Sequence, residues 1–367
     1  MVVCQVLWAT SLQPIGNMDG NGEVEPPDQP RKIAYWMSER KCGEFNMEEL
    51  QDILRGHGLE LVKVDLDQPL DKQGPFAVFL HKLAPFLLAS EAGNAQAKEK
   101  VKTIEAYLKR HPETVMLDPF PNVERLHDRR IMYSAVENNH VFVPSFVELN
   151  ATDVEKNLEI VTHAGITFPM VMKPMSAPEH QMWLVFGPQG LKDIQLPCVA
   201  MTFVNHNALL YKVFVIGHHY EIVERPSIRN LQPSDTAPTI EFNSHSISKP
   251  DSDHPLTVKE EDDEKAIKKE DLDIGLFDRI VHHLREDLGL MLFGVDVVIE
   301  KGTGKHAIID INVFPGYSGV ADVMYHLSEC ILTCDAEAGS ELSDVVDSGI
   351  EMGYSSDEKQ KLPLTTS

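Results

Sequence analysis

Residues 292–313, LFGVDVVIEKGTGKHAIIDINV, are the most informative part of this sequence. Two apolar runs flank the turn KGTGK, a pattern that predicts a β-hairpin. If the two strands pair symmetrically about Thr303, the side chain of Asp296 lies directly opposite that of Asp310. Asn312 comes two residues after Asp310 and therefore shares its face of the strand. The hairpin thus predicts two carboxylates and one amide side by side on one sheet face.

Carboxylates that face each other on a sheet repel, and here each one also interrupts an apolar strand. A divalent cation removes this conflict. Carboxylate and amide oxygens are the ligands that Mg²⁺ prefers, and nucleotide phosphates often complete its coordination. We therefore expect Asp296, Asp310 and Asn312 to bind magnesium. The alternative is that one aspartate points into solvent at the edge of the sheet.

Magnesium between carboxylates suggests phosphoryl transfer, which also needs cations around the phosphates. Lys173 ends an apolar strand, Lys212 begins another, and Arg129 opens a helix. A buried lysine is costly unless it has a partner. For each lysine alone, a side chain that extends into solvent is an equal alternative. Together with the aspartates, the three residues favour a nucleotide site.

The loop KPMSAPEHQM, residues 173–182, lies between two apolar strands, as loops over phosphates often do. Phosphate loops usually contain glycine, because backbone N–H groups must approach the anion closely. This loop contains none, and Pro178 lacks an N–H donor. It is therefore either a phosphate lid with few donors or an ordinary tight turn.

The composition is that of a soluble globular protein. The chain has 367 residues, of which 43% are hydrophobic and 25% charged, so it has room for two or three domains. The net charge is −24, and residues 1–30, 251–273 and 331–367 contribute −4, −6 and −6, which leaves −8 for the rest. This acidity argues against nucleic acid as a partner, but a few gathered lysines could still bind a small anion.

Cysteine usage and hydropathy indicate the compartment. Five scattered cysteines form no CxxC pair, so we expect neither a disulfide framework nor a zinc site. No apolar run approaches the ~20 residues that a membrane span needs. We expect a cytoplasmic monomer with no membrane partner.

The order of the predicted elements divides the chain into four parts. Residues 1–30 read as a disordered leader. Residues 31–122 alternate strands and helices, as in an open α/β domain. Residues 123–334 are rich in antiparallel strands and include a charged insert at 251–273. Residues 335–367 are acidic and poor in hydrophobic residues, which predicts a disordered tail.

Apolar spacing predicts the main helices. In the first domain it predicts helices over residues 46–57 and 92–110, and in the second over residues 153–164 and 278–288.

Nine motifs, in order from about residue 31 to residue 330, carry a specific resemblance. They are YWMSERK (35–41), HKL (81–83), LDP (117–119), HDR (127–129), FVNHNALLYKVFVIG (203–217), RPS (225–227), FNSHSISKP (242–250), LFGVDVVIE (292–300) and IDINVFPGYSG (309–319). Together they resemble the inositol-tetrakisphosphate 1-kinase family, whose members are ATP-grasp enzymes.

The resemblance implies an α/β (α+β) protein with the ATP-grasp fold, in which an N-terminal open α/β domain precedes two β-rich subdomains that clasp ATP. It implies nucleotide contacts at Arg129, Lys173, Met201, Phe203, Val204, Asn205, Tyr211, Ser227, Ser244 and Ser248. It implies inositol-phosphate contacts at Lys41, Lys82, Lys212, Asn312 and Gly316. It also implies two Mg²⁺ sites at Asp296, Asp310 and Asn312, with Lys212 and Asp310 as the catalytic residues.

The loop at residues 173–182 departs from the family pattern, which reads approximately K-x-x-x-A-[HD]-G-T-x-x-S-H-x-M. About three residues, corresponding to the [HD]-G-T, are absent between Ala177 and Pro178. His180 aligns with the later histidine of the pattern and does not replace the missing one. Loss of one transition-state contact of ~3 kcal/mol would slow turnover about a hundredfold or more.

Three functions follow from these observations. The first is a kinase that uses ATP to phosphorylate inositol 3,4,5,6-tetrakisphosphate at the 1-position and inositol 1,3,4-trisphosphate at the 5- or 6-position. The second is a catalytically impaired protein that binds ATP and inositol phosphates, which the shortened loop favours. The third is carboxylate–amine ligation by another ATP-grasp enzyme, against which the motifs YWMSERK and HKL argue.

Overall fold

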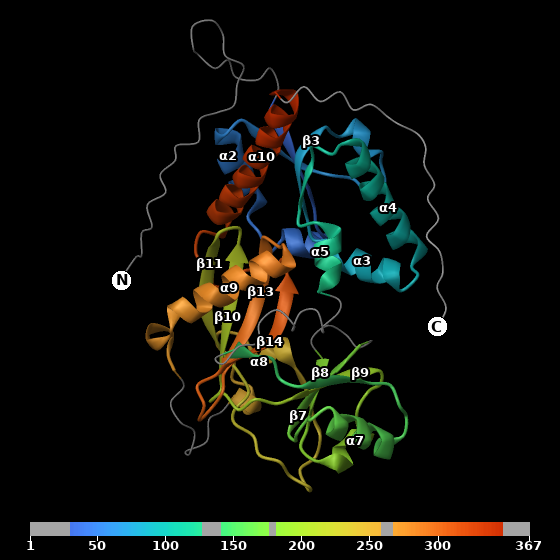
Figure 1. Cartoon of the computed structure of the whole chain (residues 1–367), viewed down its shortest axis with the longest axis vertical. Coiled ribbons are helices and arrows are strands. Elements are labelled where there is room, and N and C mark those ends of the chain that lie inside the picture. The colour runs from blue at the N-terminus through green and yellow to red at the C-terminus, as the bar shows by residue number, and fades with distance from the viewer. Residues whose placement is uncertain (1–29, 127–140, 176–180, 258–266, 348–367) are drawn as a thin grey trace, which may run out of the picture.

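The computed structural model of this chain describes residues 30–126, 141–175, 181–257 and 267–347. The strands within these ranges form three sheets. Figure 1 shows the N-terminal sheet at one end of the molecule, a second sheet in the middle and a third towards the opposite end. Almost all of the predicted leader lies outside the described residues.

The N-terminal domain is an open parallel α/β domain, as the sequence predicts. Its strands follow the order β2-β1-β3-β4, and each pairing is parallel. Helices cover both faces of such a sheet, which agrees with the apolar run of the inner strand β3. The strands are β1 (Arg31–Trp36), β2 (Leu59–Lys63), β3 (Phe76–His81) and β4 (Val115–Leu117). The helices are α1 (Glu39–Cys42), α2 (Met47–Gly56), α3 (Ala84–Glu91), α4 (Ala95–Arg110) and α5 (Phe120–Arg125), with a 3₁₀ turn η1 (Leu70–Lys72).

Local signals predict α2 but not α3. The Asn46 side chain accepts a hydrogen bond from the Glu49 N–H, which caps the start of α2 and agrees with the predicted helix over 46–57. The sequence of α3, APFLLASE, is mostly apolar and lacks a polar face, so its periodicity does not reveal a helix. The predicted helix at 92–110 begins at Ala95 instead.

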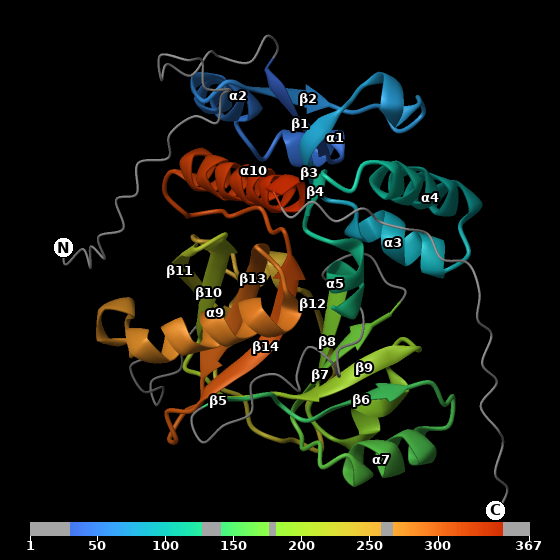
Figure 2. The same ribbon diagram turned by 45° about the horizontal axis from the view of Figure 1, so that its top comes forward.

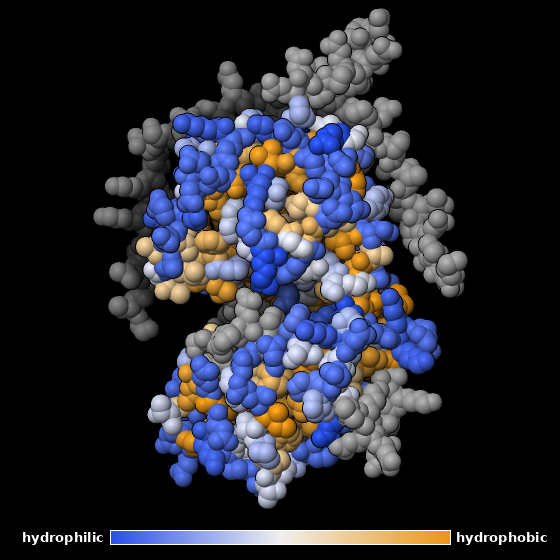
Figure 3. All heavy atoms as spheres, turned by 180° about the vertical axis from the view of Figure 1, so that it is seen from behind, coloured by the Kyte–Doolittle hydropathy of each residue, from blue (hydrophilic) through white to orange (hydrophobic). Residues whose placement is uncertain are grey.

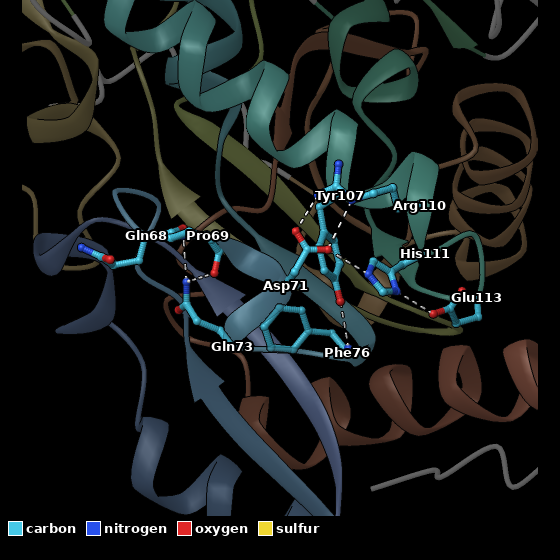
Figure 4. A network of polar contacts seen from close by, with 9 residues as sticks. All are labelled: Gln68, Pro69, Asp71, Gln73, Phe76, Tyr107, Arg110, His111 and Glu113. Atoms are coloured by element: carbon cyan, nitrogen blue, oxygen red, sulfur yellow. Dashed lines mark hydrogen bonds and ion pairs between the residues drawn. The ribbon is translucent and has the colours of Figure 1, made fainter.

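A polar network joins the end of α4 to the η1 turn (Figure 4). His111 Nε2 lies 3.1 Å from Asp71 Oδ1, and His111 Nδ1 lies 3.0 Å from Glu113 Oε1. Arg110 Nη2 contacts Asp71 Oδ2 at 2.7 Å. Hydrogen bonds to Glu113 and Asp71 raise the pKa of His111 above its ordinary value of 6.5.

We expect His111 to make the protein less stable as the pH rises. A histidine whose pKa is higher in the folded state stabilises fully below the unfolded value of 6.5, and this stabilisation is lost as the pH rises through the folded pKa. The melting temperature of the wild type should therefore fall more between about pH 6 and about pH 8 than that of His111→Gln. His57→Gln, at the exposed end of α2, should follow the wild type. Equal pH profiles for the wild type and His111→Gln would contradict this expectation.

The sheet farthest from the N-terminal domain is antiparallel, with the order β12-β8-β7-β9-β6. On β7, Met170 and Met172 are buried in one cluster with Val161 of α7. Because side chains alternate along a strand, Lys173 faces away from α7. The elements are β6 (Phe146–Leu149), α7 (Val154–His163), β7 (Met170–Pro174), β8 (Gln181–Val185), η2 (Pro188–Lys192), β9 (Cys198–Thr202), β12 (Ile240–Asn243), α8 (Ser244–Ile247) and η3 (Pro255–Thr257).

The middle sheet has the order β11-β10-β13-β14-β5, antiparallel except for the pair β14 and β5. One face carries Val213, Val295 and Ile308, which are buried with Phe277 and Leu284 of α9. The other face is therefore turned away from α9. The elements are β5 (Val141–Phe142), β10 (Leu209–Ile216), β11 (His219–Pro226), η4 (Lys269–Asp271), α9 (Ile274–Leu288), β13 (Leu292–Ile299) and β14 (His306–Val313). Helix α9 includes the predicted helix over 278–288 and begins one turn earlier.

The last helix, α10 (Val323–Asp347), lies between the N-terminal sheet and the middle sheet, as Figure 2 shows. Its Leu327 and Ile331 are buried in one cluster with Ile33 of β1 and Phe214 of β10. The helix therefore joins the two parts of the molecule through apolar contacts.

The prediction that a disordered tail begins at residue 335 is wrong, because α10 continues to Asp347. Cys334 is buried in the core, and Asp335 Oδ1 lies 2.8 Å from Arg31 Nη2 at the start of β1. The segment looked disordered because it is acidic and poor in hydrophobic residues, whereas its helix continues from the apolar contacts of Leu327, Ile331 and Cys334. Residues 348–367 lie outside the described residues.

The predicted limits of the charged insert, 251–273, are too wide. Leu256 is buried in the cluster of β8 and α8, and Leu272 is buried in the cluster of α9, so both ends belong to the folded lobes. Residues 258–266 lie outside the described residues. The predicted boundary between residues 122 and 123 falls inside α5.

Two further features describe the outside of the molecule. Seen from behind, the surface is mostly polar and is hollowed on one side between its upper and lower halves (Figure 3). None of the helices in the described ranges combines the length and apolar character that crossing a membrane requires.

Candidate active site

The final hairpin brings the two predicted carboxylates together, but the register of its strands differs from the symmetric pairing that was predicted. Asp296 pairs with Asp310, as expected from symmetry about Thr303. The turn itself lies earlier, because Ile299 pairs with His306. A register shift next to Asp296 restores the predicted pairing.

The register shift has a direct effect on where Asp310 lies. Ile308 and Ile311 are buried in the cluster with α9, whereas Ile309 packs with Val298 on the opposite face. Two consecutive residues, Ile309 and Asp310, therefore lie on the face turned away from α9. A regular strand with the observed turn would have placed Asp310 on the α9 side.

Two lysines, one from each of the two β-rich sheets, contact the aspartates. Lys212 on β10 pairs with Asp296 on β13, and its Nζ lies 2.9 Å and 2.8 Å from the two carboxylate oxygens. Lys173, from the end of β7 in the other sheet, has its Nζ 3.8 Å from Asp310 Oδ1. Asn312 Nδ2 donates a hydrogen bond to Asp310 Oδ2 at 3.2 Å. The structure thus gathers five of the six residues that the sequence placed around the metal and the phosphates, and the sixth, Arg129, lies outside the described residues.

The electrostatics of this group fit a divalent cation. The side chain of Asp296 is 15% exposed and that of Asp310 is 26% exposed. Burial raises the pKa of Asp296 and the negative charge of Asp310 adds to this, while Lys212 acts in the opposite direction. In the part of the chain that the structure describes, no three His, Cys, Asp or Glu side chains gather around a metal position. The amide of Asn312 lies beside the Asp310 carboxylate, and an amide oxygen is a ligand type that suits Mg²⁺.

The segment between β9 and β10 connects the two β-rich sheets and contains a buried histidine. Asn207 and Ala208 have positive φ angles of 56° and 59°, which turn the chain sharply. His206 Nδ1 donates to the Val204 carbonyl at 2.6 Å, and its Nε2 accepts from Ser227 Oγ at 2.7 Å. Burial lowers the pKa of His206 to about 4, so the ring is neutral. His206 thus joins two positions that the resemblance assigns to ATP.

Sequence reasoning missed His206. Its partner Ser227 is 21 residues away on another element, so spacing carries no signal. His206 stands between Asn205 and Asn207, and nothing in this stretch of sequence names its partner.

The other positions assigned to the nucleotide lie on or near this connection. Met201 on β9 pairs with Val171 on β7, and the Phe203 ring centroid lies 5.6 Å from that of His206. The Asn205 side chain exchanges hydrogen bonds of 3.0 and 2.7 Å with the backbone of Leu231. The Asn205 side chain therefore fixes the backbone at Leu231.

The remaining positions that the resemblance assigns to the nucleotide are Ser244, Ser248, Tyr211 and Arg129. Ser244 begins α8 and Ser248 follows its end, with Ser248 Oγ donating to the Ser244 carbonyl at 3.2 Å. Tyr211 lies on the face of β10 that is turned towards α9, opposite to Lys212. Its ring is buried against Phe277 of α9 and its hydroxyl donates to the Ile267 carbonyl. Arg129 lies outside the described residues.

The positions expected to hold inositol phosphates lie beside the loop that follows β14. Lys82 Nζ donates to the Phe314 carbonyl and lies 5.7 Å from the centroid of the Phe314 ring. Lys41 Nζ lies 2.5 Å from Glu44 Oε2. A Cβ on Gly316 would lie 3.9 Å from Lys41 Nζ. The N-terminal domain therefore presents two lysines to the loop that continues from Asn312.

A buried aspartate joins the N-terminal domain to the final hairpin of β13 and β14. It stands in the motif LDP, but no role for it was predicted from the sequence. Asp118, after β4, accepts hydrogen bonds from the N–H groups of Met291 and Leu292 at 2.8 and 3.0 Å. Burial raises the pKa of Asp118 to about 7, although both N–H donors lower it. His81 Nε2 donates to the Asp118 carbonyl at 2.6 Å. The strand that carries Asp296 is thus anchored next to Lys82.

Comparison with known proteins accounts for both parts of the chain. Residues 32–123 match the family model described as the inositol 1,3,4-trisphosphate 5/6-kinase pre-ATP-grasp domain. Residues 135–333 match the inositol 1,3,4-trisphosphate 5/6-kinase ATP-grasp domain.

Two curated relatives are similar over most of their length. The chain is 38% identical to the inositol-tetrakisphosphate 1-kinase of Xenopus laevis over 347 residues, which cover 88% of this chain and 84% of the relative. It is 38% identical to the inositol-tetrakisphosphate 1-kinase of Danio rerio over 317 residues, which cover 82% and 79%.

Solved structures show the same fold at low sequence identity. The ATP-grasp ligase PsnB, complexed with a minimal precursor, superposes with a TM-score of 0.52 at 12% identity, over 83% of this chain and 99% of that one. D-cycloserine synthetase DcsG superposes with a TM-score of 0.52 at 10% identity, over 84% and 99%. These two support the ATP-grasp fold alone. Because the two family domains follow one another along most of the sequence, this ATP-grasp protein belongs to the inositol 1,3,4-trisphosphate 5/6-kinase family.

Proposed function

We propose that the protein is a magnesium-dependent kinase that transfers the γ-phosphate of ATP to a ring hydroxyl of an inositol polyphosphate. The proposed substrates are inositol 3,4,5,6-tetrakisphosphate, at the 1-position, and inositol 1,3,4-trisphosphate, at the 5- or 6-position. We further propose that it acts as a cytoplasmic monomer with two Mg²⁺ sites. The observation that carries this proposal is the pair Asp296–Asp310, with the lysines Lys212 and Lys173 on its two carboxylates.

In this proposal Asp296, Asp310 and Asn312 hold Mg²⁺, which supplies positive charge for the phosphates of ATP. With the carboxylates engaged in this way, the ammonium groups of Lys212 and Lys173 are available to phosphate oxygens. They would stabilise the negative charge on the transferred group while the hydroxyl attacks in line. Lys41 and Lys82 would orient the inositol ring through its phosphates, which lowers the barrier by positioning.

The competing proposal is a protein that binds ATP and inositol phosphates but transfers poorly. The absence of the [HD]-G-T residues after Ala177 favours it, because the phosphate loop then has fewer donors. The loop itself, residues 176–180, lies outside the described residues.

One experiment separates the two proposals. The purified full-length chain is assayed with Mg-ATP and, in separate reactions, inositol 3,4,5,6-tetrakisphosphate and inositol 1,3,4-trisphosphate, beside Asp310→Asn, and ATP binding is measured by calorimetry. Transfer by the wild type that disappears in the variant supports the kinase. Nucleotide binding without transfer to either inositol phosphate supports the impaired protein and rejects the kinase.

We expect His206 to matter for nucleotide affinity. His206→Ala removes the hydrogen bonds that hold Val204 and Ser227 together, so the KM for ATP should rise about tenfold, as when one or two polar contacts are lost. The KM for the inositol phosphate should change little. His283→Ala, an exposed residue of α9, is the control. Unchanged ATP affinity in a variant that still melts cooperatively would show that this contact does not support the nucleotide site.

A further inference from the structure

One acidic side chain lies among the residues proposed to bind inositol phosphates. Glu44, between α1 and α2, has its Oε2 2.5 Å from Lys41 Nζ. Arg40 Nη1 lies 3.6 Å from its other oxygen, Oε1. The side chain of Lys41 is 17% exposed and that of Glu44 is 33% exposed, so this ion pair is partly shielded from water. Partial shielding makes the contact between the two charges stronger than that of a fully exposed pair.

Glu44 also reaches the loop that follows the metal hairpin. A Cβ added to Gly316 would lie 2.8 Å from Glu44 Oε2, closer than non-bonded atoms normally approach. The neighbouring Phe45 packs its ring 5.5 Å from that of Phe314, whose carbonyl accepts from Lys82. The Glu44 carboxylate therefore lies between Lys41 and Gly316, on the side of the loop where Lys82 also arrives.

This ion pair differs from the two lysine–aspartate pairs of the metal site. Asp296 and Asp310 belong to the proposed magnesium ligands, so the cation compensates their charge when it is bound. Glu44 is not among the proposed magnesium ligands, and its ion-pair partners in the described residues are Lys41 and, at 3.6 Å, Arg40. A ring phosphate that approaches Lys41 meets this negative charge directly.

We propose that Glu44 is a specificity-determining residue of the inositol-phosphate site, where its carboxylate competes with a substrate phosphate for Lys41. This inference rests on the proposed function, since it takes Lys41 and Gly316 as contacts of the substrate. Glu44 occupies the anion position when the substrate is absent. It weakens the binding of highly phosphorylated inositols, and thus limits which of them the protein holds.

The test is the substitution Glu44→Gln, which keeps the shape of the side chain and removes its charge. Calorimetric titration with inositol 3,4,5,6-tetrakisphosphate should give a Kd about tenfold lower than that of the wild type, the scale expected for one like charge removed near a phosphate. The difference should shrink as ionic strength rises, because salt screens the repulsion. Affinity for ATP should not change.

The matched control is Glu48→Gln. Glu48 is an exposed residue in the first turn of α2, four residues away, and its substitution changes the net charge by the same amount. Its Kd for the tetrakisphosphate should stay within about twofold of the wild type, because an exposed and distant charge is screened. If the affinity for the tetrakisphosphate rises equally in both variants, the effect comes from net charge alone and the inference is overturned.

The outcomes separate this inference from the proposed function. Tighter binding by Glu44→Gln without turnover in any variant upholds the inference and rejects the kinase. If the wild type turns over and the KM of Glu44→Gln for the inositol phosphate equals that of the wild type, the kinase is upheld and the inference is overturned. Weaker binding by Glu44→Gln also overturns it, since Glu44 would then orient Lys41 for the substrate. Absence of binding by all variants overturns both.

Discussion

Asp310→Asn is expected to lower the turnover of inositol 3,4,5,6-tetrakisphosphate about a thousandfold, the upper range for one lost preorganised electrostatic contact. The substitution keeps the size of the side chain and its contact with Asn312. It removes the charge that faces Asp296 and that Lys173 contacts at 3.8 Å. The loss should appear mainly in kcat, because the contact is needed most as charge develops on the transferred phosphate.

The matched control for this prediction is Glu300→Gln. Glu300 lies at the turn of the same hairpin, where its carboxylate accepts a hydrogen bond from Thr303 and where an amide oxygen can replace it. Initial rates over a range of Mg²⁺ concentrations are measured for both variants. Glu300→Gln should keep activity within about twofold, whereas Asp310→Asn should need more Mg²⁺ and stay slow at saturation. An Asp310→Asn rate within tenfold of the wild type would remove Asp310 from the catalytic residues.

Asp118→Ala is expected to lower the free energy of unfolding by about 3 kcal/mol, the cost of losing two buried hydrogen bonds and leaving their donors unpaired. The Met291 and Leu292 N–H groups would lose their acceptor at the start of β13. The interface between the N-terminal domain and the middle sheet would lose its buried polar anchor. Chemical denaturation followed by circular dichroism measures this effect.

Asp52→Ala is the control for Asp118→Ala. Asp52 lies on α2 and contacts Arg55 at 2.7 Å, with 74% of its side chain exposed. An exposed ion pair of this kind contributes between 0 and about 1 kcal/mol, so its loss should be barely measurable. If both substitutions cost the same, the two backbone N–H bonds of Asp118 would not be an anchor of the domain interface.

Much of the architecture follows from local patterns. The open α/β domain, the antiparallel second part and the final hairpin are confirmed, because periodicity and turn residues act over a few residues. The helix α3 was missed because its sequence APFLLASE has no polar face. The tail boundary was wrong because α10 finds its apolar partners in β1 and β10, which are far away in the sequence.

The sequence alone determined which residues could carry the chemistry. Asp296, Asp310 and Asn312 interrupt apolar strands, and Lys173 and Lys212 adjoin apolar runs, so their cost when buried already implied a shared site. Only the tertiary structure decided how they meet. The turn lies earlier than symmetry about Thr303 requires, and the register shift beside Asp296 returns Asp310 to the correct face.

The partners of the site are likewise a matter of tertiary structure. His206 with Ser227, Asp118 with Leu292, and Glu44 with Gly316 join residues from different elements. No periodicity or spacing links such pairs, because the distance along the chain does not determine the distance in space once sheets and helices pack. Packing of the N-terminal domain on the hairpin therefore decided which acidic and basic side chains lie beside the loop that follows β14.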